Sequence, residues 1–121
     1  MLTPSRNVQV HLALEPVDFR NAIDGLCGLV RNRLASDPLV GHVWVFHNRT
    51  RSALKLLFWD QGGYVLVHKR LARGRFRVPK GTGDRVRLSN AELVALLEGI
   101  DLSKARRLPR WNPPETGVKA L

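Results

Sequence analysis

The feature that most constrains the fold is a change in the spacing of apolar residues near residue 38. From Phe19 to Leu34 apolar residues recur every three or four positions, which is the period of an amphipathic helix. Farther along, three runs are rich in β-branched and aromatic residues, at 43–47, 53–59 and 64–69. Their connections are short and contain Asn, Asp or Gly, as β-hairpin turns do. A helix followed by an antiparallel meander is therefore predicted.

Weaker signals predict the remaining elements. Apolar residues alternate in places from Val8 to Leu14, which indicates a first strand that can join the meander. Asp18 is a candidate N-cap of the first helix. Residues 71–87 contain few apolar side chains and three glycines, so a long loop or an irregular edge is expected there. Ser89 and Glu92 have the spacing of a capping box, which predicts a second short helix.

Together these elements predict an α+β domain. An antiparallel meander of three to four strands packs one apolar face on one main helix, with a second short C-terminal helix. The chain has 121 residues, which is the size of a single domain, and residues 1–102 are assigned to it. Residues 103–121 are basic and contain three prolines, so this tail is expected to be extended or disordered.

Residue composition narrows the setting in which the protein works. Cys27 is the only cysteine, so an internal disulfide is impossible, and its place in the apolar helical stripe favours a small buried side chain over a reactive thiol. No segment has the apolar run of a signal peptide or a membrane span, and a cytoplasmic protein without membrane contact is expected. Trp44 and Trp59 lie on predicted strands and are interpreted as core residues, whereas Trp111 has no assigned role.

Positive charge is the strongest functional signal. The net charge is +10, and the segment from Arg49 to Arg87 holds eleven basic residues against two acidic ones. In a meander the connection at 48–52 and the segment after residue 69 leave the same end of the sheet. Basic residues far apart in sequence are therefore expected to meet at one rim and to bind phosphates. The predicted nucleic-acid-binding residues are Arg49, Arg51, Lys55, Lys69, Arg70, Arg73, Arg75, Arg77 and Lys80.

Two readings of this cluster stay open. Arginine, which dominates it, can hold two phosphate oxygens or the O6 and N7 atoms of guanine with its planar fork. Alternatively, the same side chains form a solvated basic face. Phe76, between Arg75 and Arg77, either contacts a base or anchors the loop to the core.

No catalytic or metal site is predicted. His11, His42, His47 and His68 are scattered over different strands, and a zinc site needs convergent ligands. The aspartates are better explained as caps and turn formers than as ligands of two metal ions. A non-enzyme without cofactors is expected.

Several sequence blocks resemble one protein family. They are Val17-Asp18-Phe19-Arg20, Asp24-Gly25-Leu26, Asp37-Pro38 with Gly41, Val45-Phe46-His47-Asn48-Arg49, Lys55-Leu56-Leu57-Phe58-Trp59-Asp60, Lys69-Arg70-Leu71, Gly74-Arg75-Phe76, Pro79, Glu92-Leu93 and Leu96-Leu97-Glu98-Gly99-Ile100-Asp101. This set is similar to the accessory protein encoded by the second reading frame of the sixty-six family of bacterial insertion sequences, called TnpB and distinct from the RNA-guided nuclease of that name. The resemblance spans about residues 8 to 101. Val78, where the family is expected to have tryptophan, and Thr50-Arg51-Ser52 depart from its pattern.

The resemblance implies a protein that assists transposition beside a separate transposase, without a cofactor. Two hypotheses follow. The first is a DNA-binding factor that holds the element ends or helps to assemble the transposase on them. The alternative is a protein adaptor whose basic rim docks on an acidic surface of the transposase, without specific DNA binding.

Overall fold

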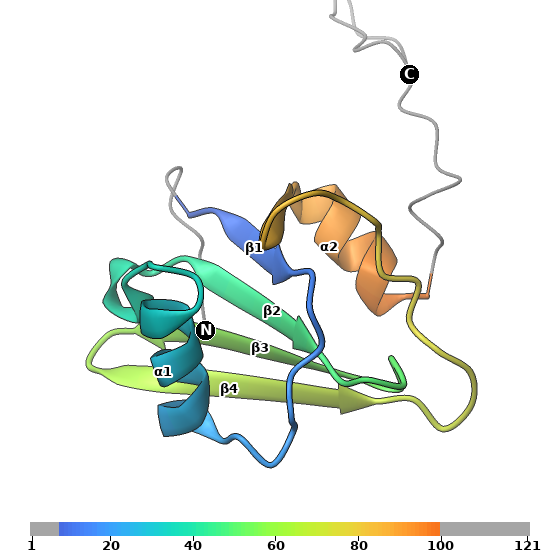
Figure 1. The fold of residues 1–121 in the computed structure, drawn as a ribbon, viewed down its shortest axis with the longest axis horizontal. Coiled ribbons are helices and arrows are strands. Elements are labelled where there is room, and N and C mark those ends of the chain that lie inside the picture. The colour runs from blue at the N-terminus through green and yellow to red at the C-terminus, as the bar shows by residue number, and fades with distance from the viewer. Residues whose placement is uncertain (1–7, 100–121) are drawn as a thin grey trace, which may run out of the picture.

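The computed structural model describes residues 8–99, which form a five-stranded mixed sheet with two α-helices and one 3-10 turn (Figure 1). The strand order across the sheet is β4-β3-β2-β1-β5. In chain order the elements are β1 (Val10–Ala13), α1 (Ile23–Asn32), η1 (Pro38–Val40), β2 (Val43–His47), β3 (Ala53–Asp60), β4 (Gly63–Arg70), β5 (Arg85–Leu88) and α2 (Asn90–Leu97). The predicted α+β class is confirmed.

The antiparallel meander is confirmed as β2-β3-β4. The first strand also joins the sheet, but it runs parallel to β2, because the chain crosses over through α1 before it returns. The sheet has one strand more than predicted. β5 pairs antiparallel with β1 at the edge of the sheet, within the segment that the sequence assigned to a loop or irregular edge. Its four residues alternate basic and apolar side chains, too short a run for a clear signal.

Apolar side chains cover both faces of the sheet, whereas the sequence predicted packing on one. On one face, Leu26 and Val30 of α1 pack against Trp44, Phe46 and other core residues. On the other, α2 and the loop after β4 cover a second cluster of buried apolar residues: Val10, Leu12, Val45, Leu54, Leu56, Phe76, Leu88 and Leu96. The two faces arise because alternate residues of β2 and β3 point in opposite directions and both sets are apolar.

The two helices begin differently. Asp18 does not cap α1, contrary to the prediction, because its carboxylate accepts from the backbone N–H of Arg20 at 2.8 Å and pairs with the Arg20 guanidinium at 2.6 Å. The helix therefore starts only at Ile23. The capping box predicted for α2 is confirmed, since Ser89 Oγ accepts from the Glu92 N–H and the Glu92 carboxylate accepts from the Ser89 N–H.

Two of the other core assignments are confirmed, since Cys27 and Trp44 are buried, 2% and 1% exposed. Trp59, also predicted as a core residue, is only half-buried and belongs to neither core cluster; its ring lies edge-on to Tyr64. Trp111, the tail at 103–121 and the boundary at residue 102 lie outside the described residues, so the proposed division of the chain stays a prediction.

The fold makes one prediction about pH. His11 on β1 stacks on Trp44, and burial, assisted by the nearby Arg85 charge, lowers its pKa from 6.5 to about 4. Between these values the unfolded chain binds a proton at His11 that the folded chain does not, so stability falls as the pH drops from 6.5 to 4. Urea denaturation at pH 7 and pH 5 measures the loss. His11→Phe keeps a ring on Trp44 and should reduce the loss; an equal loss in this variant would contradict the assignment.

Candidate nucleic-acid interface

The turn between β2 and β3 is held by one side chain. The Asn48 Oδ1 atom accepts from the backbone N–H groups of Ser52 at 2.9 Å and Ala53 at 3.2 Å, and its Nδ2 donates to Ser52 Oγ at 2.9 Å. Arg51 takes a left-handed conformation, with φ of 57°. These bonds close the turn around Asn48 and leave Arg49 and Arg51 exposed at its tip.

The loop after β4 is docked on this turn. Two backbone bonds join them, from Leu71 N–H to Ser52 O at 2.8 Å and from Phe76 N–H to Arg51 O at 2.7 Å. The Phe76 ring is fully buried in the second apolar cluster, so the loop is anchored and the reading of Phe76 as a base contact is wrong. Burial of the residue between Arg75 and Arg77 leaves both arginines exposed.

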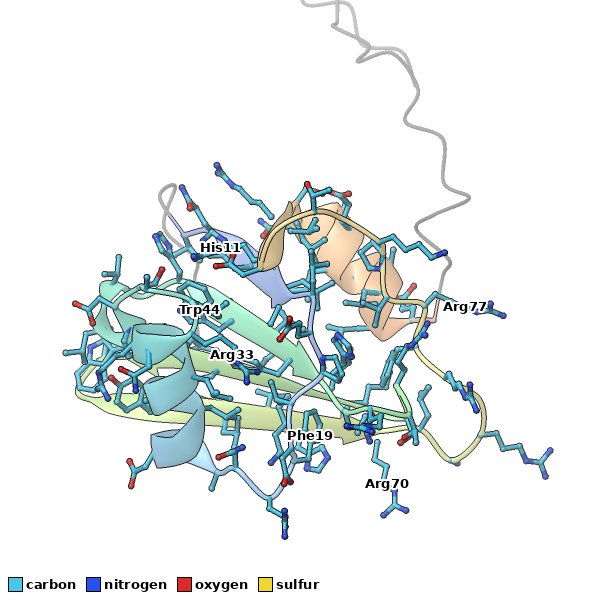
Figure 2. All side chains as sticks on the ribbon, viewed as in Figure 1. His11, Phe19, Arg33, Trp44, Arg70 and Arg77 are labelled. Atoms are coloured by element: carbon cyan, nitrogen blue, oxygen red, sulfur yellow. The ribbon has the colours of Figure 1, made fainter. Side chains whose placement is uncertain are left out.

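The predicted meeting of distant basic residues therefore occurs at one end of the sheet, on the right in Figure 1, where Arg70 and Arg77 extend outward (Figure 2). We call the exposed cations of this end the basic rim. Its members are Arg49, Arg51, Arg70, Arg73, Arg75, Arg77 and Lys80. Within residues 8–99 none of them forms an ion pair with a carboxylate; the ion pairs lie at Arg20–Asp18, Arg33–Glu15 and Arg85–Asp84.

Lys55, predicted as a phosphate contact, has another role. Its side chain is 6% exposed, and Nζ donates to the carbonyl oxygens of Phe19 at 2.9 Å and Asn21 at 2.8 Å. Nζ also lies 4.9 Å from the centre of the Phe19 ring. The ammonium thus holds the segment that leads into α1 and is not available to a phosphate. The alternation of side chains along the strand could have predicted this burial, because Lys55 shares a face with the core residue Leu57.

Lys69 lies beside the rim and is partly engaged. Its Nζ donates to the carbonyl oxygen of Leu97 at 2.6 Å, at the C-terminal end of α2. A cation there satisfies a free carbonyl and interacts favourably with the helix dipole. Lys69 remains exposed, so a contact with an anion competes with this bond.

Arg85, outside the predicted set, is also structural. It donates to Ser36 Oγ at 2.9 Å and to the Leu34 carbonyl, pairs with Asp84, and lies 5.3 Å from the centre of a Trp44 ring. The segment of high positive charge therefore contains two kinds of residue, one that holds the fold and one that faces solvent.

The four histidines do not form one cluster, although the rings of His11 and His42 are in edge-to-face contact with centroids 5.5 Å apart. His47 is buried, with Nε2 and Nδ1 at 3.1 and 3.2 Å from the carbonyl oxygens of Leu14 and Asn48. His42 Nδ1 accepts from the Gln9 N–H at 3.0 Å. Over residues 8–99, no three metal-ligating side chains gather, and no helix is long and apolar enough to cross a membrane.

Comparison with known proteins places the chain in a family. The model of the IS66 Orf2-like proteins matches residues 8–107. The chain belongs to the IS66 Orf2-like family. Two curated relatives come from Sinorhizobium fredii: the uncharacterized protein y4jC is 34% identical over 93% of this chain and 97% of its own length, and the uncharacterized protein y4hO is 37% identical over 97% and 100%. No solved structure matches the chain.

Membership supports a transposition accessory protein, as the sequence resemblance implied. Both relatives are uncharacterized, so they indicate no binding surface for this IS66 Orf2-like protein.

The different roles of Lys55 and the rim can be tested together. Lys55→Met leaves two carbonyl groups without a donor and should lower the free energy of unfolding by about 1–3 kcal/mol. Arg73→Met, on the rim, should change it by less than about 0.5 kcal/mol. Urea denaturation of both variants measures this difference. Equal stability of the Lys55→Met variant and the unchanged protein would contradict the structural role.

Proposed function

We propose that this protein is a non-catalytic accessory factor of transposition that binds DNA through the basic rim, and that it holds the element ends or helps to assemble the transposase on them. The observation that carries the proposal is the seven exposed cations of the rim without an acidic partner within residues 8–99. Like charges gathered in this way repel one another, and an anionic ligand removes the repulsion.

The rim suits a phosphate backbone for three reasons. Six of its seven members are arginines, whose planar guanidinium groups match phosphate oxygens in bidentate geometry. They come from the turn at 48–52, the end of β4 and the following loop, so the charge spreads over several segments rather than one point. The turn and the loop are joined by backbone bonds, so less conformational entropy is lost when DNA binds.

A second candidate is the protein adaptor, in which the rim docks on an acidic surface of the transposase. A cluster of unpaired cations fits an acidic protein as well as a phosphate backbone by charge alone. Leu39 and Val40 add a specific observation, since they are 50% and 59% exposed on η1, at the end of the sheet opposite the rim. An adaptor joins two partners and needs a second contact surface apart from the rim, and the centres of such surfaces are more apolar than the rest of the protein.

DNA binding through the rim predicts a defined salt dependence. About six phosphate contacts give a slope of about −5 in a plot of log affinity against log salt concentration. Arg73→Ala combined with Arg75→Ala removes two contacts and should weaken the slope by about 2 while the fold stays intact. Fluorescence anisotropy with terminal inverted-repeat DNA and a scrambled duplex of equal length measures both quantities.

A charge-matched control comes from Arg31 and Arg87, which are exposed but lie on α1 and β5. Arg31→Ala with Arg87→Ala should make the salt-dependence slope less steep by a much smaller amount than the rim variant does. Equal effects of the two variants would mean that net charge alone binds DNA. Undetectable DNA binding, together with a stable complex with the transposase, would favour the adaptor.

A further inference from the structure

A groove of about 430 Å³ opens beside the basic rim. It lies between the segment that follows β1, the end of β2 with its turn, and the loop at 78–81; its lining residues are Leu14, Pro16, His47, Arg49, Arg51, Val78, Pro79, Lys80 and Gly81. Its volume falls within the range of about 300–1,000 Å³ that sites for small organic ligands occupy.

The walls of this groove are held by backbone contacts. Leu14 N–H donates to Asp84 O at 3.0 Å, and Val17 N–H donates to His47 O at 2.9 Å. A Cβ atom at Gly81 would lie 2.7 Å from a Val86 methyl group and 3.3 Å from a Leu14 methyl group, so only glycine lets the loop lie this close to the sheet. The groove is therefore part of the fold and needs no rearrangement to form.

Two kinds of side chain line the groove. Arg49, Arg51 and Lys80 are exposed and carry three positive charges, and no carboxylate belongs to the lining formed by the described residues. The remaining lining is mostly aliphatic, from Pro16, Val78 and their neighbours. The His47 ring nitrogens are within hydrogen-bond distance of backbone carbonyl oxygens, so this side chain adds no free base to the groove.

A ligand that fits this arrangement has a negative group beside a flat apolar body. A nucleotide has both, a phosphate for the cations and a base for the aliphatic part of the lining. Bases within a duplex are stacked and paired, so they cannot enter a groove, whereas an unpaired base can.

We propose that this groove binds an unpaired nucleotide at a DNA end, next to duplex held by the rim. The inference rests on the proposed DNA binding and adds the class of DNA that the protein prefers, which is a duplex with a single-stranded extension. Arg49 and Arg51 belong to the rim and the groove, so one arginine pair borders both the duplex and its unpaired end.

The test compares a blunt duplex with the same duplex carrying a single-stranded extension at one end, using the full chain. Fluorescence anisotropy should show about five- to tenfold tighter binding of the extended DNA, near the lower end of the range for one stacked base because the base contacts aliphatic side chains. A 2-aminopurine at the first unpaired position should brighten, because its base leaves the stack for a groove in which no described lining residue is tryptophan or tyrosine.

Two charge-matched variants separate the groove from the rest of the rim. Arg49→Ala with Lys80→Ala should reduce the preference for extended DNA to about one. Arg73→Ala with Arg75→Ala should weaken both DNAs and leave the preference unchanged. Circular dichroism of both variants checks that they fold.

Each outcome decides between the two proposals. Equal affinity for both DNAs, an unchanged 2-aminopurine signal, or a preference that survives the Arg49 and Lys80 substitutions would overturn the groove inference and leave DNA binding by the rim intact. Absence of binding to either DNA would overturn both.

Discussion

The burial of Phe76 is the contact on which the basic rim depends. The ring is fully buried against the face of the sheet opposite α1, and its backbone N–H donates to Arg51 O, so Phe76 fixes the loop to the turn together with the Leu71–Ser52 backbone bond. The repulsion between two rim charges is much weaker than the packing energy of a buried aromatic ring. Two charges about 10 Å apart in water repel by about 0.4 kcal/mol, and salt screens them further, whereas truncation of a buried phenylalanine costs about 3–5 kcal/mol. The burial of Phe76 therefore outweighs the repulsion between any two charges of the rim.

Burial also sorts the basic residues into two functional groups. Lys55 and Arg85 come from the same positively charged segment as the rim, yet both donate to backbone carbonyl oxygens on the α1 side of the sheet. Their charges stabilise the segments before and after α1. The side chains of the rim make no such bonds to residues 8–99. Lys69 lies between the two groups because it caps α2 while it remains exposed. The net charge thus overstates the size of the binding surface, because some of the basic residues hold the fold. The surface that we propose for DNA is smaller and consists of the exposed cations of the rim.

Family membership and geometry answer different questions. The IS66 Orf2-like family places the protein in transposition. The structure adds a cationic rim bordered by a partly aliphatic groove, and we propose that these two features bind duplex DNA and its unpaired end. Both features use the end of the sheet where β1 and β2 finish and β3 begins, because the parallel pairing of β1 with β2 brings Pro16 beside Arg49. The crossover through α1 is therefore what joins groove and rim.

Local patterns by themselves determined much of this protein. The spacing from Phe19 to Leu34, the hairpin connections and the Ser89 capping box predicted α1, the meander and α2, since these signals depend on near neighbours in the chain. The convergence of the basic residues also followed, because a meander returns to the same end of the sheet. Only the tertiary structure decided that β5 pairs with β1, that both faces are covered, that Lys55 is buried and that a groove borders Arg49. These features arise from contacts between residues far apart in the sequence, and no local pattern encodes which partner a strand edge or a buried ammonium finds.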